Sequence, residues 1–254
     1  MNDSQGKATT SHRPFGEPPS RRLQWDADLT HRFWNYESQH PAHYFTFRYG
    51  NKIAKRLRQY LAGCKTVLDF GCGPGFLVPH LLHLGLTVTG ADFSKDSVAM
   101  VNKQSQMQRN CRGAFHVDEL LLRKERYDAV IAVEVIEHLN DQHLTITLDM
   151  VKGLVSKGGV VIFTTPNEED LDAETVFCPM CEHVFHRWQH VRSWTRDSLV
   201  DCLKHHGYEV FDVFTTDFSA NLLRSSVRAL RQILGRGNGV KDPHLVCVCH
   251  VPNA

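Results

Sequence analysis

The sequence predicts an α/β protein built on a doubly wound, mostly parallel sheet of seven strands. Short runs rich in β-branched residues alternate with helical stretches, as in KTVLDF (65–70), LTVTGAD (86–92) and YDAVIAV (127–133). Such runs are typical of parallel strands buried on both faces. A glycine-rich turn at 71–75 also follows the first strand and precedes a helix, which is where such sheets bind their ligands.

Strands and helices are expected to alternate along the chain. Apolar runs predict strands at 65–70, 86–92, 113–118, 127–133, 158–166, 208–216 and 243–251. Helical patterns fall at 76–85, 94–106, 141–154 and 194–207. Thr195 is placed to cap the start of the last helix.

Composition divides the chain into parts. Residues 1–22 are rich in Ser, Pro, Gly and charge, which predicts a disordered leader. Aromatic and histidine residues crowd the next segment, so we expect an N-terminal helical cap at 23–62, followed by the main domain at 63–254. Two insertions interrupt this domain: a Cys/His-rich flap at 166–193 and an amphipathic segment at 218–240.

The amphipathic segment places Leu223, Val227, Leu230 and Leu234 on one helical stripe, with arginines elsewhere. This pattern predicts a lid or packing helix, or alternatively a helix that makes peripheral contact with a membrane surface. Membrane contact would favour a lipid or a lipid-linked acceptor.

Charge and composition restrict the class of protein. The 29 Lys and Arg residues nearly balance the 28 Asp and Glu residues, so no global positive field attracts nucleic acid or anionic lipid. No stretch approaches the ~20 apolar residues that span a bilayer, and the N-terminal residues lack the apolar core of a signal peptide, so we expect a cytoplasmic protein. The eight cysteines are expected to be reduced thiols or metal ligands.

The glycine-rich turn indicates which ligand the sheet binds. Its glycines are Gly71, Gly73 and Gly75, whereas dinucleotide-binding turns use G-x-G-x-x-G. Pro74 also removes one of the N–H donors that a pyrophosphate needs. The turn therefore favours a ligand without phosphates. S-adenosylmethionine fits, because it is a nucleoside joined to an amino acid and needs close backbone approach at Gly71 and Gly73.

Three carboxylates near the turn are candidates to hold that ligand. Asp69 ends the first strand, near the expected ammonium group. Asp92 ends the second strand, where an acidic residue accepts hydrogen bonds from ribose hydroxyls. Asp118, which we expect to end the third strand, is placed to accept from the adenine amino group.

The motifs VLDFGCGPG, TGAD, YDAVIAVEVIEHL and GGVVIFTTPN resemble, in order and spacing, those of class I S-adenosylmethionine-dependent methyltransferases. The resemblance runs from about residue 48 to the C-terminus and implies a Rossmann-like domain. FRYGNKI and VEVIEHL are most similar to ubiquinone-biosynthesis O-methyltransferases. This resemblance implies that the cofactor is contacted by Arg48, Gly71, Asp92 and Val133.

An acidic stretch after the fourth strand predicts a metal site. Glu134, Glu137 and His138 stand at i, i+3 and i+4, so a helical turn would place them on one side at the carboxyl edge of the sheet. They suit Mg²⁺, Mn²⁺ or Zn²⁺ with open positions for substrate oxygens. Alternatively, Glu137 and His138 cap the helix and hydrogen-bond the cofactor loop.

A later histidine extends this site by resemblance. EVIEH is also similar to the metal-dependent small-RNA 3′-terminal 2′-O-methyltransferases, in which a histidine from a later loop completes the site. Their H-x-x-x-W-T-R pattern matches residues 190–196 here. The resemblance implies His190 as the fourth ligand.

The stretch FCPMCEHVFHRWQH at 177–190 predicts a second metal. The pattern C-x2-C-x4-H-x3-H would form a closed tetrahedral zinc site from Cys178, Cys181, His186 and His190. A tighter set would use His183 in place of His190, leaving His190 to the catalytic metal. Alternatively, no zinc binds and the two cysteines pack under the flap.

These features predict a methyltransferase that acts on a hydroxyl of a small molecule, a glycan or a lipid-linked intermediate. A divalent ion would lower the pKa of that hydroxyl and orient it. Without a metal, the candidate bases are His138, His190 and His143. An RNA 2′-O-methyltransferase and a non-catalytic S-adenosylmethionine-binding module are alternatives, and the near-neutral charge argues against an RNA partner.

Overall fold

A computed structural model describes residues 21–105, 108–220 and 241–252. The predicted leader lies outside these residues except for its last two. The apolar stripe of the predicted amphipathic insertion lies outside them as well. Among the described residues, no helix combines the length and the apolar character that a bilayer crossing requires.

The core is a sheet of seven strands in the order β4–β3–β2–β5–β6–β10–β9. The strands from β4 to β6 are parallel, and β10 runs antiparallel to both β6 and β9. This arrangement confirms the predicted fold class. The strands are β2 Thr66–Phe70, β3 Thr87–Asp92, β4 Cys111–His116, β5 Tyr127–Val133, β6 Val155–Pro166, β9 Glu209–Thr216 and β10 His244–His250.

The winding direction of the sheet reverses at its centre. β2 pairs with β3 on one side and with β5 on the other. Open α/β sheets bind ligands beyond the carboxyl ends of the strands at such a point. Because β2 ends at Phe70 and β5 ends at Val133, the glycine turn and the predicted metal-binding stretch leave the sheet side by side.

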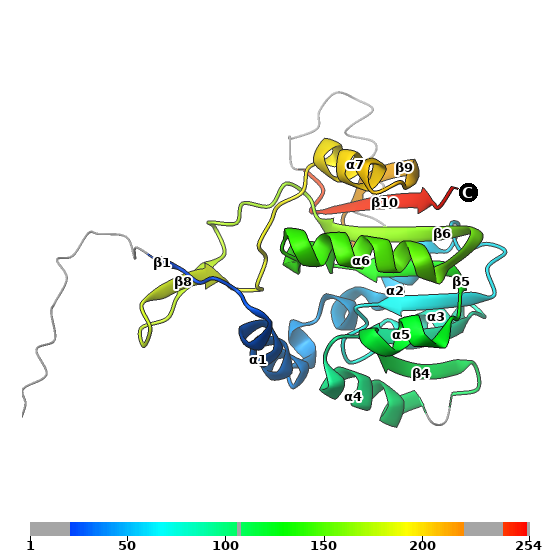
Figure 1. Cartoon of the computed structure of the whole chain (residues 1–254), viewed down its shortest axis with the longest axis horizontal. Helices are drawn as coiled ribbons and strands as arrows, with labels where there is room; N and C mark the ends of the chain where they lie inside the picture. The colour runs from blue at the N-terminus through cyan, green and yellow to red at the C-terminus, as the bar shows by residue number, and fades with distance from the viewer. Residues whose placement is uncertain (1–20, 106–107, 221–240, 253–254) are drawn as a thin grey trace, which may run out of the picture.

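Helices cover both faces of the sheet (Figure 1). On one face, α2 and α3 bury apolar side chains against the strands, and on the other face α5, α6 and α7 do so. Thr195 and Ser198 form a reciprocal capping box at the start of α7, which confirms the predicted cap. The helices are α1 Ala27–Ser38, α2 Phe45–Leu57, α3 Val78–His83, α4 Lys95–Ser105, α5 Val117–Arg123, α6 Asp141–Leu154 and α7 Arg196–His205.

The predicted strand at 113–118 ends earlier than expected. β4 stops at His116, and the chain enters α5 at Val117. The His116 ring accepts a hydrogen bond from the Asp118 backbone N–H (3.3 Å) and so caps the helix. Asp118 therefore lies in the first helical turn rather than at a strand end, because an acidic residue is favoured near a helix N-terminus.

The predicted Cys/His flap contains a small sheet that projects from the main domain (Figure 1). β7 Thr175–Phe177 and β8 His183–His186 form an antiparallel hairpin, and β1 Arg21–Arg22 pairs in parallel with β8. Trp25 packs edge-on against Phe185 of β8, with ring centroids 5.8 Å apart. The N-terminal cap and the flap are therefore joined to each other.

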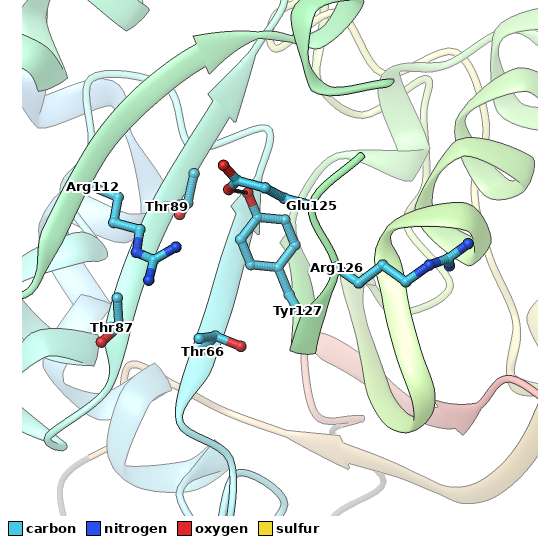
Figure 2. Close-up of a pocket in the computed structure, with 7 residues that line it drawn as sticks. All are labelled: Thr66, Thr87, Thr89, Arg112, Glu125, Arg126 and Tyr127. Carbon is cyan, nitrogen blue, oxygen red and sulfur yellow. Dashed lines mark hydrogen bonds between the residues drawn. The ribbon is translucent and has the colours of Figure 1, made fainter. Parts of the chain in front are cut away.

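Cavities lie at both ends of the strands. At the amino ends, Thr66, Thr87 and Tyr127 help to line a hollow of about 80 Å³ (Figure 2). At the carboxyl ends, a cavity of about 1250 Å³ extends from the glycine turn to the flap and α1. Of these two cavities, the larger has room for a nucleoside cofactor and an acceptor together.

Candidate functional site

The glycine turn has a backbone that larger residues cannot adopt. Gly71 and Gly73 have φ angles of 73° and 51°, in the left-handed region that favours glycine. A Cβ atom on Gly71 would lie 2.5 Å from Val135, and one on Gly73 would lie 2.6 Å from the Tyr44 ring. The Gly71 and Cys72 N–H groups both donate to the Ala91 carbonyl (2.8 and 2.9 Å). The turn is therefore fixed against β3 and closely packed by Val135 and Tyr44, and its residues Gly71 and Cys72 line the large cavity.

Two buried aspartates flank this turn. Asp92 accepts hydrogen bonds from the Gly73 and Ser94 N–H groups, both at 2.8 Å. Asp69 Oδ2 is buried without a hydrogen-bond partner among the described residues. Burial raises the pKa of Asp92 to about 6; burial and the charge of Asp92 raise the pKa of Asp69 to about 7. A ligand that brings positive charge or hydroxyl donors would stabilise both carboxylates in their ionised form.

Other predicted cofactor residues surround the same cavity. Val133 and Arg48 line it, and Arg48 Nε donates to the Ala42 carbonyl at 2.6 Å. Asp118 also borders the cavity, but its side chain is 84% exposed. Asp118 thus lies at the rim of the cavity on a helix, not at a strand end as predicted, and its contact with adenine stays a prediction.

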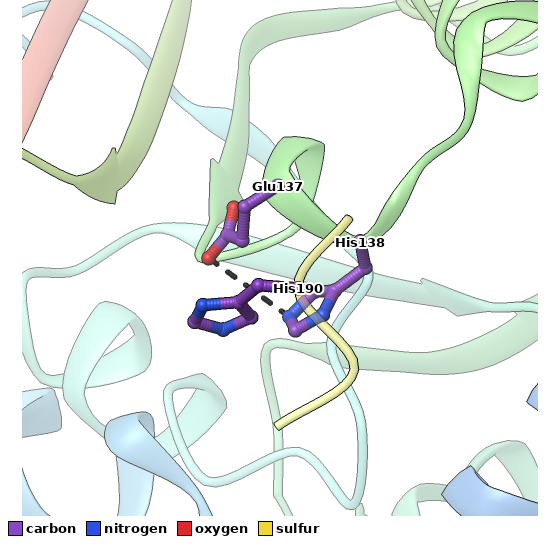
Figure 3. Close-up of side chains that lie close together, drawn as sticks. All are labelled: Glu137, His138 and His190. Atoms are coloured by element: carbon purple, nitrogen blue, oxygen red, sulfur yellow. Dashed lines mark ion pairs between the residues drawn. The ribbon is translucent and has the colours of Figure 1, made fainter. Parts of the chain in front are cut away.

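The predicted metal residues Glu137, His138 and His190 come together (Figure 3). Glu137 and His138 lie in a short 3₁₀ turn after β5, Ile136–His138. His138 Nε2 lies 3.9 Å from Glu137 Oε1, and the His138 and His190 ring centroids are 4.8 Å apart. One ligand atom from each of the three residues lies within 4.8 Å of the others, so the group is compact enough to hold one ion.

This group is buried and short of hydrogen bonds. Both carboxylate oxygens of Glu137 and Nδ1 of His138 have no hydrogen-bond partner within the described chain. Burial, and then the charge of Glu134, raise the pKa of Glu137 well above its usual range. Burial, and then His190, lower the pKa of His138 well below its usual range. Unpaired buried polar atoms are costly, and two imidazoles with one carboxylate suit a divalent transition metal.

Glu134 does not join this group in the described structure. Its backbone has a φ of 53°, and its carboxylate accepts from the Thr164 hydroxyl at 2.7 Å and lies 3.6 Å from His244 Nδ1. The predicted i, i+3, i+4 helical face does not form, because residues 136–138 alone are in a 3₁₀ turn. Of the four predicted ligands, three therefore converge.

Sequence reasoning missed Glu169, which lies between the sheet and the flap. Its Oε2 lies 2.5 Å from His190 Nδ1, and its Oε1 lies 3.5 Å from His186 Nε2. Burial alone would raise the pKa of Glu169, but hydrogen bonds from His186 and His190, with their charge, lower it to about 2. A single glutamate in an acidic loop carries no sequence signal of this role.

Trp34 and Gln189 were also missed. Trp34 Nε1 donates to Gln189 Oε1 (2.9 Å), and Gln189 Nε2 donates to the His138 carbonyl (3.0 Å). The Trp34 ring stands edge-on to His138, with centroids 4.9 Å apart. Helix α1 therefore closes over the histidine group, and the predicted base candidate His143 lines the same cavity.

The predicted zinc ligands do not all meet. In the part of the chain that the structure describes, Cys178, Cys181, His183 and His186 form no group of three or more close enough to hold an ion. His186 belongs instead to the group of Glu169 and His190, because it ends β8 on the side that faces the cavity. The structure therefore does not bring the four predicted zinc ligands together in the described residues.

Cys178 and Cys181 remain a pair near the turn of the hairpin. The N–H groups of Cys181 and Met180, and then the Cys181 thiol, lower the pKa of Cys178. Backbone N–H groups that point at a thiolate are typical of CxxC metal knuckles. Zinc at these two thiols stays a prediction.

The sheet order, the glycine turn and the large cavity define the class I S-adenosylmethionine-dependent methyltransferases. The family model described as "Methyltransferase domain" matches residues 20–213. The chain therefore belongs to this methyltransferase family.

Curated relatives include ubiquinone biosynthesis O-methyltransferases. That of Paraburkholderia phytofirmans is 32% identical over 157 residues, which cover 57% of this chain and 62% of the relative. That of Pseudomonas fluorescens is 34% identical over 143 residues, which cover 55% of this chain and 60% of the relative. The match thus spans about three fifths of the length of these relatives.

Solved structures share the fold at low sequence identity. The glycopeptide N-methyltransferase MtfA in complex with S-adenosyl-L-methionine has a TM-score of 0.58 at 16% identity, covering 80% of this chain and 94% of that one. An S-adenosylmethionine-dependent methyltransferase from Clostridium acetobutylicum has a TM-score of 0.60 at 12% identity, covering 87% and 98%.

Proposed function

We propose that the protein transfers a methyl group from S-adenosylmethionine to a hydroxyl oxygen, with assistance from a divalent metal. The observation that carries this proposal is the buried group of Glu137, His138 and His190, of which His138 and His190 line the same cavity as Gly71. The names of the relatives above, O-methyltransferases, support the choice of oxygen as the acceptor atom. The acceptor belongs to the small molecules, glycans or lipid-linked intermediates.

The cofactor half of the site follows from the chemistry of the turn. Asp92 accepts hydrogen bonds from the ribose hydroxyls, as acidic residues at this position do in nucleotide-binding sheets. Asp69 offers an unpaired carboxylate oxygen to the cationic amino acid part of the cofactor. Gly71 and Gly73 allow close backbone approach, and Arg48, Val133 and Asp118 border the remaining space.

The residues of the acceptor half fit a divalent ion such as Zn²⁺ or Mg²⁺. Glu137, His138 and His190 would hold the ion, and the orphaned polar atoms of Glu137 and His138 would gain partners. Nitrogen ligands favour Zn²⁺ over Mg²⁺ here. When bound, such an ion lowers the pKa of an acceptor hydroxyl.

Methyl transfer is an in-line displacement, so the chain mainly orients the reactants and excludes water. The acceptor oxygen forms a bond to the methyl carbon while the carbon–sulfur bond breaks, and the hydroxyl loses its proton. Burial and His190 lower the pKa of His138, so its ring stays neutral and offers a lone pair to the ion. The hydroxyl proton then passes to solvent or to His143, the predicted base that lines the same cavity. Trp34 covers His138 from the side of α1.

The test uses purified protein, labelled S-adenosylmethionine and a panel of hydroxyl-bearing acceptors. We expect an O-methylated product by mass spectrometry and its loss with EDTA or with His190→Ala. The matched control is His83→Ala, which removes an exposed histidine on α3 and leaves turnover unchanged. Cofactor binding without any methylated product would favour a non-catalytic S-adenosylmethionine-binding module. Salt-sensitive binding of RNA would favour an RNA 2′-O-methyltransferase. Turnover that survives EDTA would exclude the metal from the reaction.

A further inference from the structure

Glu169 and His186 lie directly behind His190, on the side of the flap. The His186 and His190 rings are stacked, with centroids 4.4 Å apart and an interplanar angle of 18°. Glu169 contacts both rings. Glu169 precedes the hairpin and His186 ends it, so this contact ties together both legs of the flap.

Hydrogen bonds fix the protonation pattern of the His186 ring. The backbone N–H groups of Trp188 and His190 each lie 3.3 Å from His186 Nδ1. A nitrogen that accepts from an N–H carries no proton, so the neutral ring carries its proton on Nε2. Nε2 lies 3.5 Å from Glu169 Oε1, a contact with a carboxylate that does not meet hydrogen-bond geometry.

The protonation of His186 distinguishes between a second metal site and a supporting role for Glu169, His186 and His190. Glu169, His186 and His190 are close enough to one another to hold a second ion. A protonated Nε2 has no lone pair, however, so His186 cannot ligate an ion from that atom. The group is therefore better explained as a support for the His190 ring, through the hydrogen bond from His190 to Glu169, than as a second metal site.

The same reasoning applies to His190. Its Nδ1 lies 2.5 Å from Glu169 Oε2, and a carboxylate only accepts hydrogen bonds, so Nδ1 carries the proton. The lone pair of the neutral ring then lies on Nε2. In metalloproteins a carboxylate behind a histidine commonly sets the tautomer and the ring orientation in this way.

We propose that Glu169 is a positioning residue that holds His190 in the Nδ1–H tautomer, with the His186 ring as the neighbour that packs against His190 and contacts the other Glu169 oxygen. This inference rests on the proposed function, because it assigns His190 Nε2 as the nitrogen offered to the ion. It also links the flap to the reaction, since Glu169 and His186 frame the hairpin.

The first test reads the tautomer in the metal-free protein, by long-range ¹H–¹⁵N correlation of the histidine rings. We expect wild-type His190 to show a protonated Nδ1, and Glu169→Gln to lose that pattern, since its amide N–H₂ can donate to Nδ1. Glu169→Asp keeps a carboxylate and retains the pattern. A protonated Nε2 on His190 in the wild type would overturn the inference whether or not the protein binds metal.

The second test titrates Co²⁺ and follows its visible absorption. We expect Glu169→Gln to bind Co²⁺ about 10–100-fold more weakly than the wild type, and Glu169→Asp to lose less. The matched control Glu168→Gln removes the neighbouring carboxylate, which pairs with Lys241 instead, and keeps wild-type affinity. If Glu169→Gln binds Co²⁺ with wild-type affinity, the positioning role is refuted. If the wild-type protein itself binds no Co²⁺, the metal in the proposed function is refuted, and the tautomer test alone then decides the role of Glu169.

Discussion

The two halves of the cavity are built in different ways. The cofactor half is a stretch of backbone: one strand, one glycine turn and an aspartate on the adjacent strand, fixed by hydrogen bonds to the Ala91 carbonyl and to Asp92. The acceptor half is made of side chains from the β5 turn, the flap and α1, which meet only at Glu137, His138 and His190 and their supports. A backbone site is set by the fold itself, whereas a side-chain site depends on each contact that orients it.

Paired substitutions test whether the two halves act independently. Asp92→Asn removes a charged acceptor for ribose hydroxyls, worth about 1.5–3 kcal/mol, so cofactor affinity should fall about 10–100-fold while Co²⁺ affinity is kept. Glu137→Gln should do the reverse, because an amide of the same shape is a poor ligand. Calorimetry with S-adenosylmethionine and Co²⁺ titration measure both. If either variant lost both ligands while still folded by circular dichroism, the comparison would fail.

The pH dependence of cofactor binding sharpens the same comparison. The pKa values of Asp92 and Asp69 are raised to about 6 and about 7 by burial, with the charge of Asp92 adding to the shift of Asp69. Both groups are therefore largely protonated in the free protein at pH 5, and a cationic cofactor must displace those protons. Affinity should rise about tenfold from pH 5 to pH 7.5 as Asp92 ionises, and binding near pH 6 should release protons.

The free energy of unfolding of the ligand-free protein depends on pH in the opposite direction. A carboxyl whose folded pKa lies above its unfolded value binds more protons in the folded state, so the ligand-free protein loses stability as the pH rises from about 4 to about 7. Calorimetric titration with the cofactor, in buffers of different ionisation enthalpy, measures the protons released on cofactor binding. Binding heats that do not depend on the buffer would contradict the raised pKa values.

The sequence was sufficient to predict the geometry of the glycine turn and of the strand-end aspartates because these signals are local. The turn at 71–75 and the acid that ends β3 stand at fixed distances from predicted strands, so Gly71, Gly73 and Asp92 were identified without knowledge of the tertiary structure. Asp118 was misplaced because VDELLLR begins a helix one residue after β4. The glycine spacing also distinguished this ligand from a dinucleotide.

The acceptor half was predicted only in part: the spacing after the fourth strand gave Glu137 and His138. His190 came from a resemblance, but Glu169 and Gln189 act through contacts with residues 21 and 51 positions away in the chain. No periodicity marks such pairs. Histidine spacing alone assigned His186 to zinc, and only the direction of the backbone N–H groups at its ring shows why it serves Glu169 instead.

The smallest expected effect concerns the closure of α1 over the histidines. Trp34→Phe keeps an aromatic ring beside His138 but removes the hydrogen bond to Gln189 and one ring of the indole, so the free energy of unfolding should fall by at least about 1 kcal/mol. Co²⁺ affinity should fall about two- to fivefold, because Gln189 also holds the His138 backbone.

Tyr36→Phe is the matched control, since it removes one hydroxyl from an exposed side chain on the same helix. Urea unfolding and Co²⁺ titration of both variants separate helix stability from site geometry. Equal losses in the two variants would mean that α1 contributes only packing. A loss confined to Trp34→Phe would show that the acceptor half depends on the side-chain contacts that hold Gln189 and His138.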